Sequence, residues 1–131
     1  MTRVWIPAAL VAMTMAVPAV AQSRAVTHVD SEKVAAALAG GRGGALVSTK
    51  DFTVSGSFRK VPGQVEVHAR ETDIFYVTDG EATLVLGGTV VGGKTQQLKK
   101  GDVITIPAGT PHWFKELVTP TISYLTVKVL K

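Results

Sequence analysis

From residue 45 onward, short segments rich in Val, Ile, Phe and Thr alternate with turn-forming residues. The turn signals include Pro62-Gly63, Asp79-Gly80 and Gly87-Gly88. Turn signals about every eight to twelve residues are typical of all-β sandwiches and barrels, because each strand crosses the fold once before the chain reverses. The sequence therefore predicts an all-β domain, with strands near 45–49, 52–58, 64–68, 73–78, 82–86, 103–106, 112–117 and 121–129.

A single short helix is predicted before these strands. Asp30 or Ser31 can accept hydrogen bonds from the free N–H groups of a first helical turn, and an alanine-rich run follows. Gly40-Gly41 then supplies the flexible stop. A helix of two to three turns is not stable alone, so Val34 and Leu38 are expected to pack it against the strands.

The first residues have the pattern of a secretory signal. Arg3 precedes an apolar run over 4–17, and Ala19-Val20-Ala21 offers a cleavage site before Gln22. The alternative is an uncleaved membrane anchor, but the run is shorter than the roughly 20 residues that cross a bilayer. We expect a signal peptide at 1–21, a helix and glycine loop at 22–44 and a single β-domain at 45–131. The mature protein would be periplasmic or secreted, without a membrane segment.

Composition excludes several kinds of function. The chain has no cysteine, so neither disulfides nor a thiolate nucleophile or ligand is available. Its net charge of +4 is spread out, and Lys94, Lys99 and Lys100 form the nearest thing to a cluster. Few aromatic residues are interleaved with these lysines, so we predict no nucleic-acid partner.

Titratable residues gather in two stretches. The first, EVHARETDIFYVTDG over 66–80, places His68 and three carboxylates beside an apolar run, and the second supplies His112 after a Pro/Gly-rich bend. Residues two apart in a strand point to the same side, so Glu66 shares a face with His68, and Asp73 shares one with Phe75 and Val77. If these faces line a barrel, the charges converge in an apolar interior. Burial without partners is costly, so a metal or mutual hydrogen bonds would be required.

These two stretches resemble the paired motifs of the cupin superfamily. Gly101-x5-Pro107-x-Gly109-x2-His112 matches every fixed position of the second motif up to its histidine. The stretch ending at Gly80 resembles the first motif, though in a degenerate form. The resemblance implies a single-domain jelly-roll β-barrel, and many such barrels form homodimers, which we expect here.

The resemblance also implies a ligand set for a divalent metal. By position, the metal ligands would be Glu66, His68, Asp73 and His112, where a typical cupin has three histidines and one glutamate. Two carboxylates thus occupy unexpected slots, and Asp73 reaches about one methylene less far than a glutamate. Such a set with open positions suits Fe(II), Mn(II), Zn(II) or Ni(II). Without a metal, Glu66 would instead pair with His68, and Asp73 with Arg70 or Lys60.

Two functions follow from this resemblance, beside a third hypothesis in which the barrel is mainly a dimerisation scaffold. In the first, the metal polarises a small polar ligand in isomerase, lyase or dioxygenase chemistry. Glu66 is then the fourth ligand or the catalytic general base, and Arg70, Phe75 and Phe114 contact the substrate. In the second, the barrel is a non-catalytic module that binds a metal or a small molecule without turnover. The fold alone does not choose between them.

Overall fold

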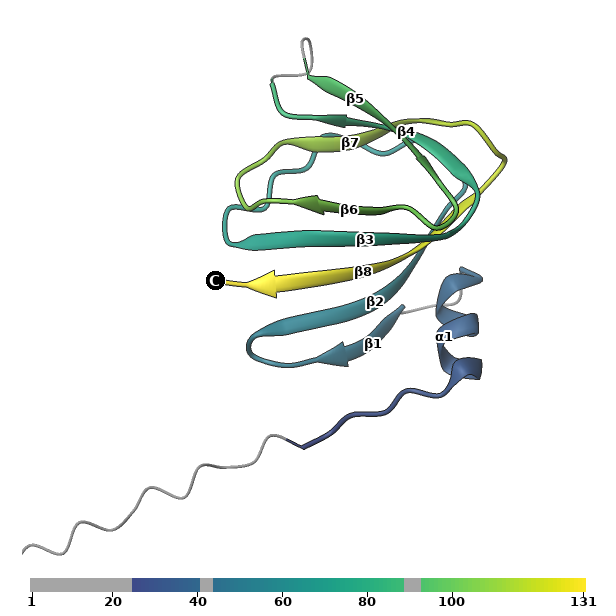
Figure 1. The fold of residues 1–131 in the computed structure, drawn as a ribbon, viewed down its shortest axis with the longest axis vertical. Helices are drawn as coiled ribbons and strands as arrows, with labels where there is room; N and C mark the ends of the chain where they lie inside the picture. The colour runs from purple at the N-terminus through teal and green to yellow at the C-terminus, as the bar shows by residue number, and fades with distance from the viewer. Residues whose placement is uncertain (1–24, 41–43, 89–92) are drawn as a thin grey trace, which may run out of the picture.

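A computed structural model describes residues 25–40, 44–88 and 93–131 of the chain. One helix and eight strands occur in these ranges (Figure 1). They are α1 (Ser31–Leu38), β1 (Ala45–Ser48), β2 (Phe52–Arg59), β3 (Glu71–Asp79), β4 (Glu81–Leu86), β5 (Lys94–Lys99), β6 (Val103–Ile106), β7 (His112–Leu117) and β8 (Ile122–Leu130).

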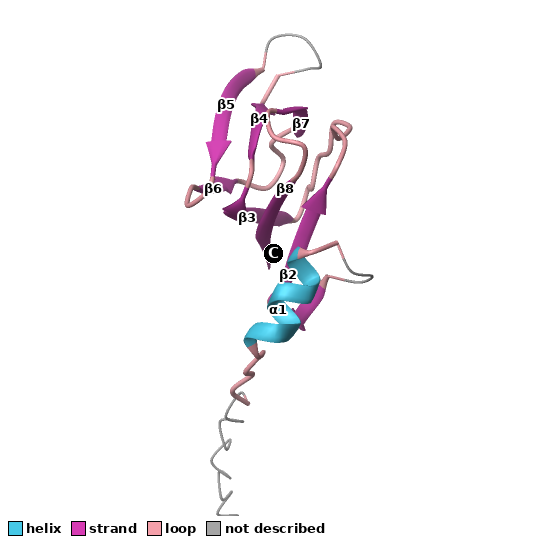
Figure 2. Ribbon diagram, turned by 90° about the vertical axis from the view of Figure 1, so that its right-hand side faces the viewer, coloured by secondary structure: helices cyan, strands magenta, loops and turns pink. Residues whose placement is uncertain are grey.

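The strands form two antiparallel sheets. The larger has the order β1-β2-β8-β3-β6, and the smaller has the order β5-β4-β7. The pairing of β8 with both β2 and β3 brings the end of the chain between two early strands. Figures 1 and 2 place the smaller sheet at one end of the molecule and α1 near the other, beside β2. The predicted all-β jelly-roll barrel with a short N-terminal helix is confirmed.

Side chains from both sheets fill one apolar core. The larger sheet contributes Phe75, Val77 and Ile122, and the smaller contributes Leu84 and Phe114, all nearly inaccessible to solvent. In β8, Ile122, Tyr124 and Thr126 are buried at every second position, as expected where one face of a strand packs on the core. Polar residues at inward-facing strand positions, such as Asp73 and His112, contribute to the site.

The strand prediction was wrong in two places. Residues 64–68 form no strand and make only an isolated bridge, in which Glu66 and His112 exchange two backbone hydrogen bonds of 2.8 and 3.0 Å. The strand β5 was not predicted, because its sequence KTQQLK is polar and only Leu98 is buried. It forms because β4 pairs with it along its whole length.

The helix begins and packs as predicted. The Asp30 carboxylate accepts a 2.9 Å hydrogen bond from the Lys33 N–H, and Val34 and Leu38 are half-buried. The absence of a side chain at Gly56 on β2 allows this packing, since a Cβ there would lie 2.6 Å from the Ala37 Cβ. The helix therefore covers part of the outer face of the larger sheet.

In the ranges that the structure describes, no helix is long and apolar enough to span a bilayer. The predicted signal peptide at 1–21 and most of the glycine loop lie outside the described residues.

Candidate metal and ligand site

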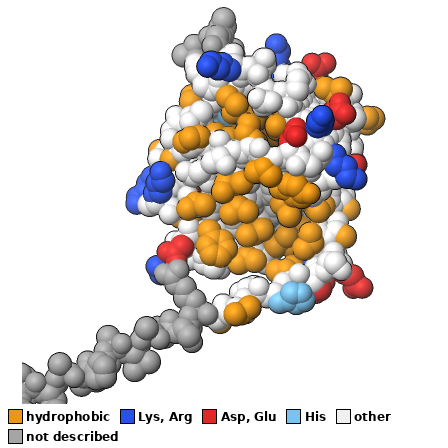
Figure 3. All heavy atoms as spheres, viewed as in Figure 1, with side chains coloured by type: hydrophobic (Ala, Val, Ile, Leu, Met, Phe, Trp, Pro, Cys, Tyr) orange, Lys and Arg blue, Asp and Glu red, His pale blue; other side chains and the backbone are white. Residues whose placement is uncertain are grey.

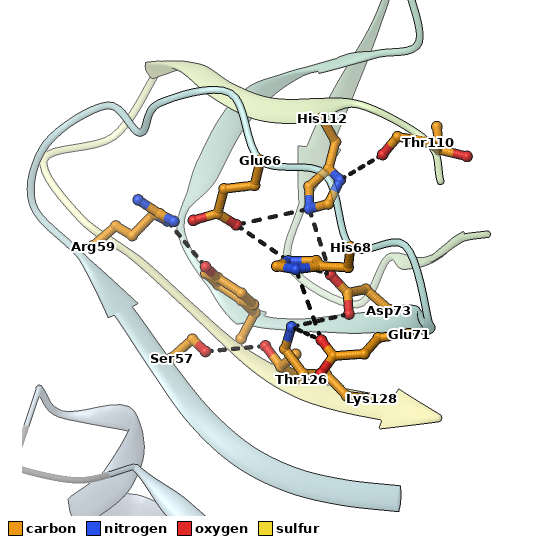
Figure 4. A network of polar contacts seen from close by, with 11 residues as sticks. Ser57, Arg59, Glu66, His68, Glu71, Asp73, Thr110, His112, Thr126 and Lys128 are labelled. Carbon is orange, nitrogen blue, oxygen red and sulfur yellow. Dashed lines mark hydrogen bonds and ion pairs between the residues drawn. The ribbon is translucent and has the colours of Figure 1, made fainter. Parts of the chain in front are cut away.

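The two histidines meet inside the barrel. His68 lies in the segment that leads into β3, Asp73 is on β3, and His112 begins β7 (Figure 4). The bridge between Glu66 and His112 holds the incoming segment against β7, so that His112 faces three groups about 40 residues earlier in the sequence. The structure thus brings together all four residues that the resemblance implied as metal ligands.

One carboxylate oxygen lies at the centre of this group. Asp73 Oδ2 is 3.4 Å from Nε2 of His68 and 3.4 Å from Nε2 of His112. Glu66 Oε2 lies 3.6 Å from His68 Nε2 and 3.8 Å from His112 Nε2. These separations are longer than hydrogen bonds, but they suit metal-ligating atoms that face a common point. The shorter side chain of Asp73 still reaches the cluster.

Burial differs between the two halves of the cluster. The side chains of Asp73 and His112 are only 3% and 4% exposed, whereas those of His68 and Glu66 are 28% and 49% exposed. The first pair forms the floor of the site and the second pair forms its rim. A small molecule would therefore approach the cluster from the side of Glu66.

The contact of His112 Nδ1 with a backbone carbonyl sets the tautomer of this histidine. Nδ1 lies 3.0 Å from the Thr110 carbonyl oxygen, which can only accept a hydrogen bond, so Nδ1 carries a proton. In the neutral ring, the lone pair of Nε2 then points at two carboxylates. Nε2 is buried and has no hydrogen-bond partner among the described residues, because its contact with Asp73 is too long. Either a proton or a metal cation on Nε2 would resolve this arrangement.

The electrostatics of the floor show the same need for positive charge. Burial opposes ionisation of Asp73, but the His112 ring and the charges of Lys128 and His68 outweigh it and lower its pKa. Burial likewise opposes protonation of His112, but Asp73, the Thr110 carbonyl and the charge of Glu66 outweigh it and raise the pKa of the imidazole. The folded protein thus favours an ionised carboxylate beside a cationic imidazole.

A lysine that sequence reasoning missed completes the floor. Lys128 Nζ donates a 2.7 Å hydrogen bond to Glu71 Oε2 and lies 3.4 Å from Asp73 Oδ1. Burial lowers the pKa of Lys128, but these two carboxylates outweigh it and raise that pKa. The pairing of Asp73 with Arg70 or Lys60, which we predicted for a metal-free site, is wrong, because Lys128 is the cation that contacts it. The alternation along β8 could have indicated Lys128. Every second residue of this strand faces inward, and Lys128 continues the series of Tyr124 and Thr126.

The described residues offer two overlapping sets of metal-binding atoms. Glu66, His68 and His112 form one, and His68, Glu71 and Asp73 form the other. The first set contains both histidines and the unpartnered Nε2. In the second, Glu71 Oε2 is already bound to Lys128, 3.7 Å from His68 Nδ1. The first set is therefore the better candidate for a metal site, and Asp73 Oδ2 lies 3.4 Å from Nε2 of both its histidines.

A cavity of about 170 Å³ opens beside the cluster. Phe75 and Phe114 line it, as predicted for substrate contact, and their rings stack 6.0 Å apart. Tyr124 packs 5.0 Å from Phe75, so the wall is aromatic. Polar groups of β2 and β8 also line the cavity: Ser55, Ser57, Arg59, Thr126 and Lys128.

Arg70, the other residue predicted to contact substrate, does not line this cavity. It is exposed, and its Nε donates a 3.2 Å hydrogen bond to the Lys131 carbonyl oxygen. The arginine that lines the cavity is Arg59, which was not among the site residues predicted from the sequence. Its place on β2, two residues beyond the inward-facing Ser57, was the signal that could have found it.

Comparison with known proteins gives one family and many similar folds. The Cupin domain family model matches residues 60–127. No curated protein matches the chain. Among solved structures, the Bacillus halodurans protein BH2720 is 16% identical with a TM-score of 0.67, covering 79% of this chain and 81% of that chain.

Two further structures extend the likeness. An RmlC-like cupin family protein of Methanocaldococcus jannaschii, with a double-stranded β-helix fold, is 16% identical with a TM-score of 0.54 and covers 66% of this chain and 76% of that one. The iron(II) form of HppE is 16% identical with a TM-score of 0.57, covering 64% of this chain and 48% of that one. At these identities the likeness concerns the fold.

Proposed function

The chain belongs to the Cupin domain family, and from that premise we propose that it holds a divalent metal ion between His68, His112, Glu66 and Asp73. The ion faces the cavity, where a small polar ligand binds. The observation that carries this proposal is the His112 ring. Its Nδ1 is committed to the Thr110 carbonyl, and its buried Nε2 points without a partner at two carboxylates.

The donor set limits the choice of metal. Two borderline imidazoles with two hard carboxylates suit Zn(II), Mn(II), Fe(II) or Ni(II) better than Cu(I), which prefers soft ligands, or Ca(II), which prefers oxygen alone. The similar fold of HppE, solved in its iron(II) form, supports including iron among the metals tested. When bound, such an ion supplies a Lewis acid that polarises an oxygen of the ligand.

The residues of this chain divide the remaining work by position. Asp73 and His112 lie on the buried floor and would fix the ion, while the half-exposed Glu66 lies where a ligand enters. From there Glu66 either completes the ligand set or takes a proton from the bound molecule as a general base. Phe75, Phe114 and Tyr124 exclude water from one side of the cavity. Isomerase, lyase and dioxygenase chemistry all remain compatible with this arrangement.

One observation favours a second candidate, a binding module without turnover. Lys128 already supplies a cation 3.4 Å from Asp73 Oδ1 and 2.7 Å from Glu71 Oε2. Part of the negative charge on the floor is therefore neutralised by the protein itself. A barrel of this kind can hold a polar ligand through its fixed charges, with the metal serving binding alone.

We also propose that the mature protein is exported and forms a homodimer. The pattern of the first 21 residues supports export. An apolar outer face supports the dimer: Tyr76 pairs with Val103 and Phe52 with Val129 across neighbouring strands. Val103 and Tyr76 are 64% and 45% exposed, and Figure 3 shows apolar side chains gathered over this part of the molecule. A contiguous apolar patch on a sheet often marks an interface.

Metal analysis and a turnover screen test the proposed function together. The mature protein would be purified without an affinity tag and its metal content measured, then incubated with small oxo-acids, sugars and diketones. About one equivalent of divalent metal per chain supports the metal site, and turnover separates the enzyme from the binding module. Protein that stays empty after incubation with Zn(II), Mn(II), Fe(II) and Ni(II) contradicts the metal site.

A further inference from the structure

We propose that Arg59 binds the carboxylate of a small organic acid in the cavity beside the cluster of histidines and carboxylates. This inference rests on the proposed function in one respect, since it assigns the ligand class of the same cavity. The metal-free protein also contains Arg59 and the cavity wall, so carboxylate binding is measurable with or without a metal.

Arg59 is held in place by two aromatic residues. Its Nε donates a 3.0 Å hydrogen bond to the Tyr124 hydroxyl oxygen, and its guanidinium carbon lies 4.8 Å from the centroid of the Phe114 ring. The hydrogen bond uses one edge of the guanidinium, and the ring contact uses one face. The two terminal nitrogens remain, and they form the fork that binds a carboxylate through two parallel hydrogen bonds.

The charges around the cavity single out this side chain. Lys128, the other lysine or arginine in the cavity lining, is already paired with Glu71 and Asp73. Glu66 and Asp73 face the two histidines. Among the residues that the structure describes, no carboxylate lies within ion-pair distance of Arg59. Of the two lysine and arginine side chains that line the cavity, Arg59 is therefore the one that forms no ion pair with a described residue.

Partial burial makes this unpaired charge informative. Arg59 is half-buried, so its guanidinium has lost part of its hydration without gaining a counter-ion from the described residues. An incoming carboxylate would restore that charge balance in surroundings of low polarity, where ion pairs are stronger than in water. In the view of Figure 4, Arg59 lies on the opposite side of Glu66 from His68. A bound acid could therefore contact Arg59 with its carboxylate while its other end faces the cluster.

The cavity also limits the size and charge of the ligand. A volume of about 170 Å³ is too small to enclose a nucleotide or an oligosaccharide. Glu66 and Asp73 also line the cavity and would repel a second negative charge, so a monocarboxylate fits better than a phosphate or dicarboxylate. The aromatic wall of Phe75, Phe114 and Tyr124 favours an apolar or aromatic body.

Paired acids and amides test this proposal, because each amide has the shape of its acid without the charge. The probes are lactate with lactamide and benzoate with benzamide, titrated into metal-free and Zn(II)-loaded protein by calorimetry or NMR. In at least one pair the acid should bind at least tenfold tighter than its amide to the metal-free protein. Arg59→Gln should remove that preference. Lys60→Gln should retain it, since the exposed neighbour Lys60 does not line the cavity.

Three outcomes would overturn the proposal: acids and amides that bind equally, acids that bind only when Zn(II) is present, or a preference that survives in Arg59→Gln. The second would leave the metal site intact and assign the carboxylate to the ion. Conversely, loss of Zn(II) binding in His112→Ala has no bearing on the acid preference of metal-free protein. If Arg59→Gln folds poorly, Tyr124→Phe replaces it. By releasing the arginine Nε, that variant should weaken acid binding more than amide binding.

Discussion

His68 and His112 lie with their ring centroids 5.4 Å apart and point Nε2 at the same oxygen of Asp73, each from 3.4 Å. One histidine lies in an irregular segment and the other begins a strand of the smaller sheet. The backbone bridge between Glu66 and His112 is what joins them. Because two imidazole nitrogens and two carboxylates converge there, the arrangement has specific consequences for metal binding.

Removing either imidazole should abolish tight metal binding. We expect His68→Ala and His112→Ala to lower Zn(II) affinity by about 100-fold or more, since loss of a direct ligand costs at least as much as loss of its supporting contacts. Competition with a chromophoric chelator measures this. His28→Ala is the matched control, because His28 is exposed and precedes the helix. Affinity that is unchanged in both variants would show that the ion binds elsewhere.

As the pH rises, the stability of the metal-free protein should fall while its affinity for Zn(II) should rise. His112 has a pKa above 6.5 in the folded protein, since Asp73, Thr110 and Glu66 outweigh the opposing effect of burial. The stability that its proton gives is complete below pH 6.5 and is lost as the pH rises through the folded pKa. A metal needs the neutral ring, so Zn(II) affinity should rise over the same interval.

Urea unfolding between about pH 6 and 8.5, with and without Zn(II), checks both trends. His112→Gln should flatten the metal-free trend. Metal-free protein that becomes more stable across this interval, with the gain absent from His112→Gln, would contradict the assignment.

Lys128 should stabilise the site when no metal is bound. Lys128→Met removes the cation bound to Glu71 and one of those near Asp73, and hydrogen bonds to charged groups typically contribute about 1.5–3 kcal/mol. We expect the free energy of unfolding of metal-free protein to fall by that amount in chemical denaturation. Lys115→Met, at an exposed position of β7, should change it little. Equal effects of the two substitutions would indicate that the Lys128 contacts are weak.

The apolar outer face should control association. A lysine at Tyr76 or Val103 places a charge within the exposed row that crosses the larger sheet. Sedimentation velocity should show a dimer for the unmodified protein and a monomer for Tyr76→Lys and Val103→Lys. Val118→Lys, an exposed valine after β7, should remain dimeric. An unmodified protein that sediments as a monomer at high concentration would exclude the dimer.

The sequence predicted the fold well where hydrophobic alternation and turn residues agreed. Asp73, Phe75 and Val77 are all buried on β3, as their spacing indicated. The prediction failed where tertiary pairing decides the structure. Strand β5 consists largely of polar residues that form a strand only because β4 lies beside it, and residues 64–68 look like a strand but make a single bridge.

The candidate site was predictable as a set of residues but not as a network. Motif spacing indicated Glu66, His68, Asp73 and His112, and the structure brings them together. Motif spacing could not indicate Lys128 or Arg59, because their roles depend on which strands β8 and β2 pair with. Both residues end a run of inward-facing positions, and only the sheet topology shows what those positions face.

Anomalous diffraction from crystals loaded with Zn(II) or Mn(II) tests the central claim most directly. The account predicts one strong peak within about 2.0–2.3 Å of Nε2 of both His68 and His112, with oxygens of Glu66 and Asp73 completing the shell. A peak held by His68, Glu71 and Asp73 without His112, or no peak at this cluster in fully loaded crystals, would contradict it.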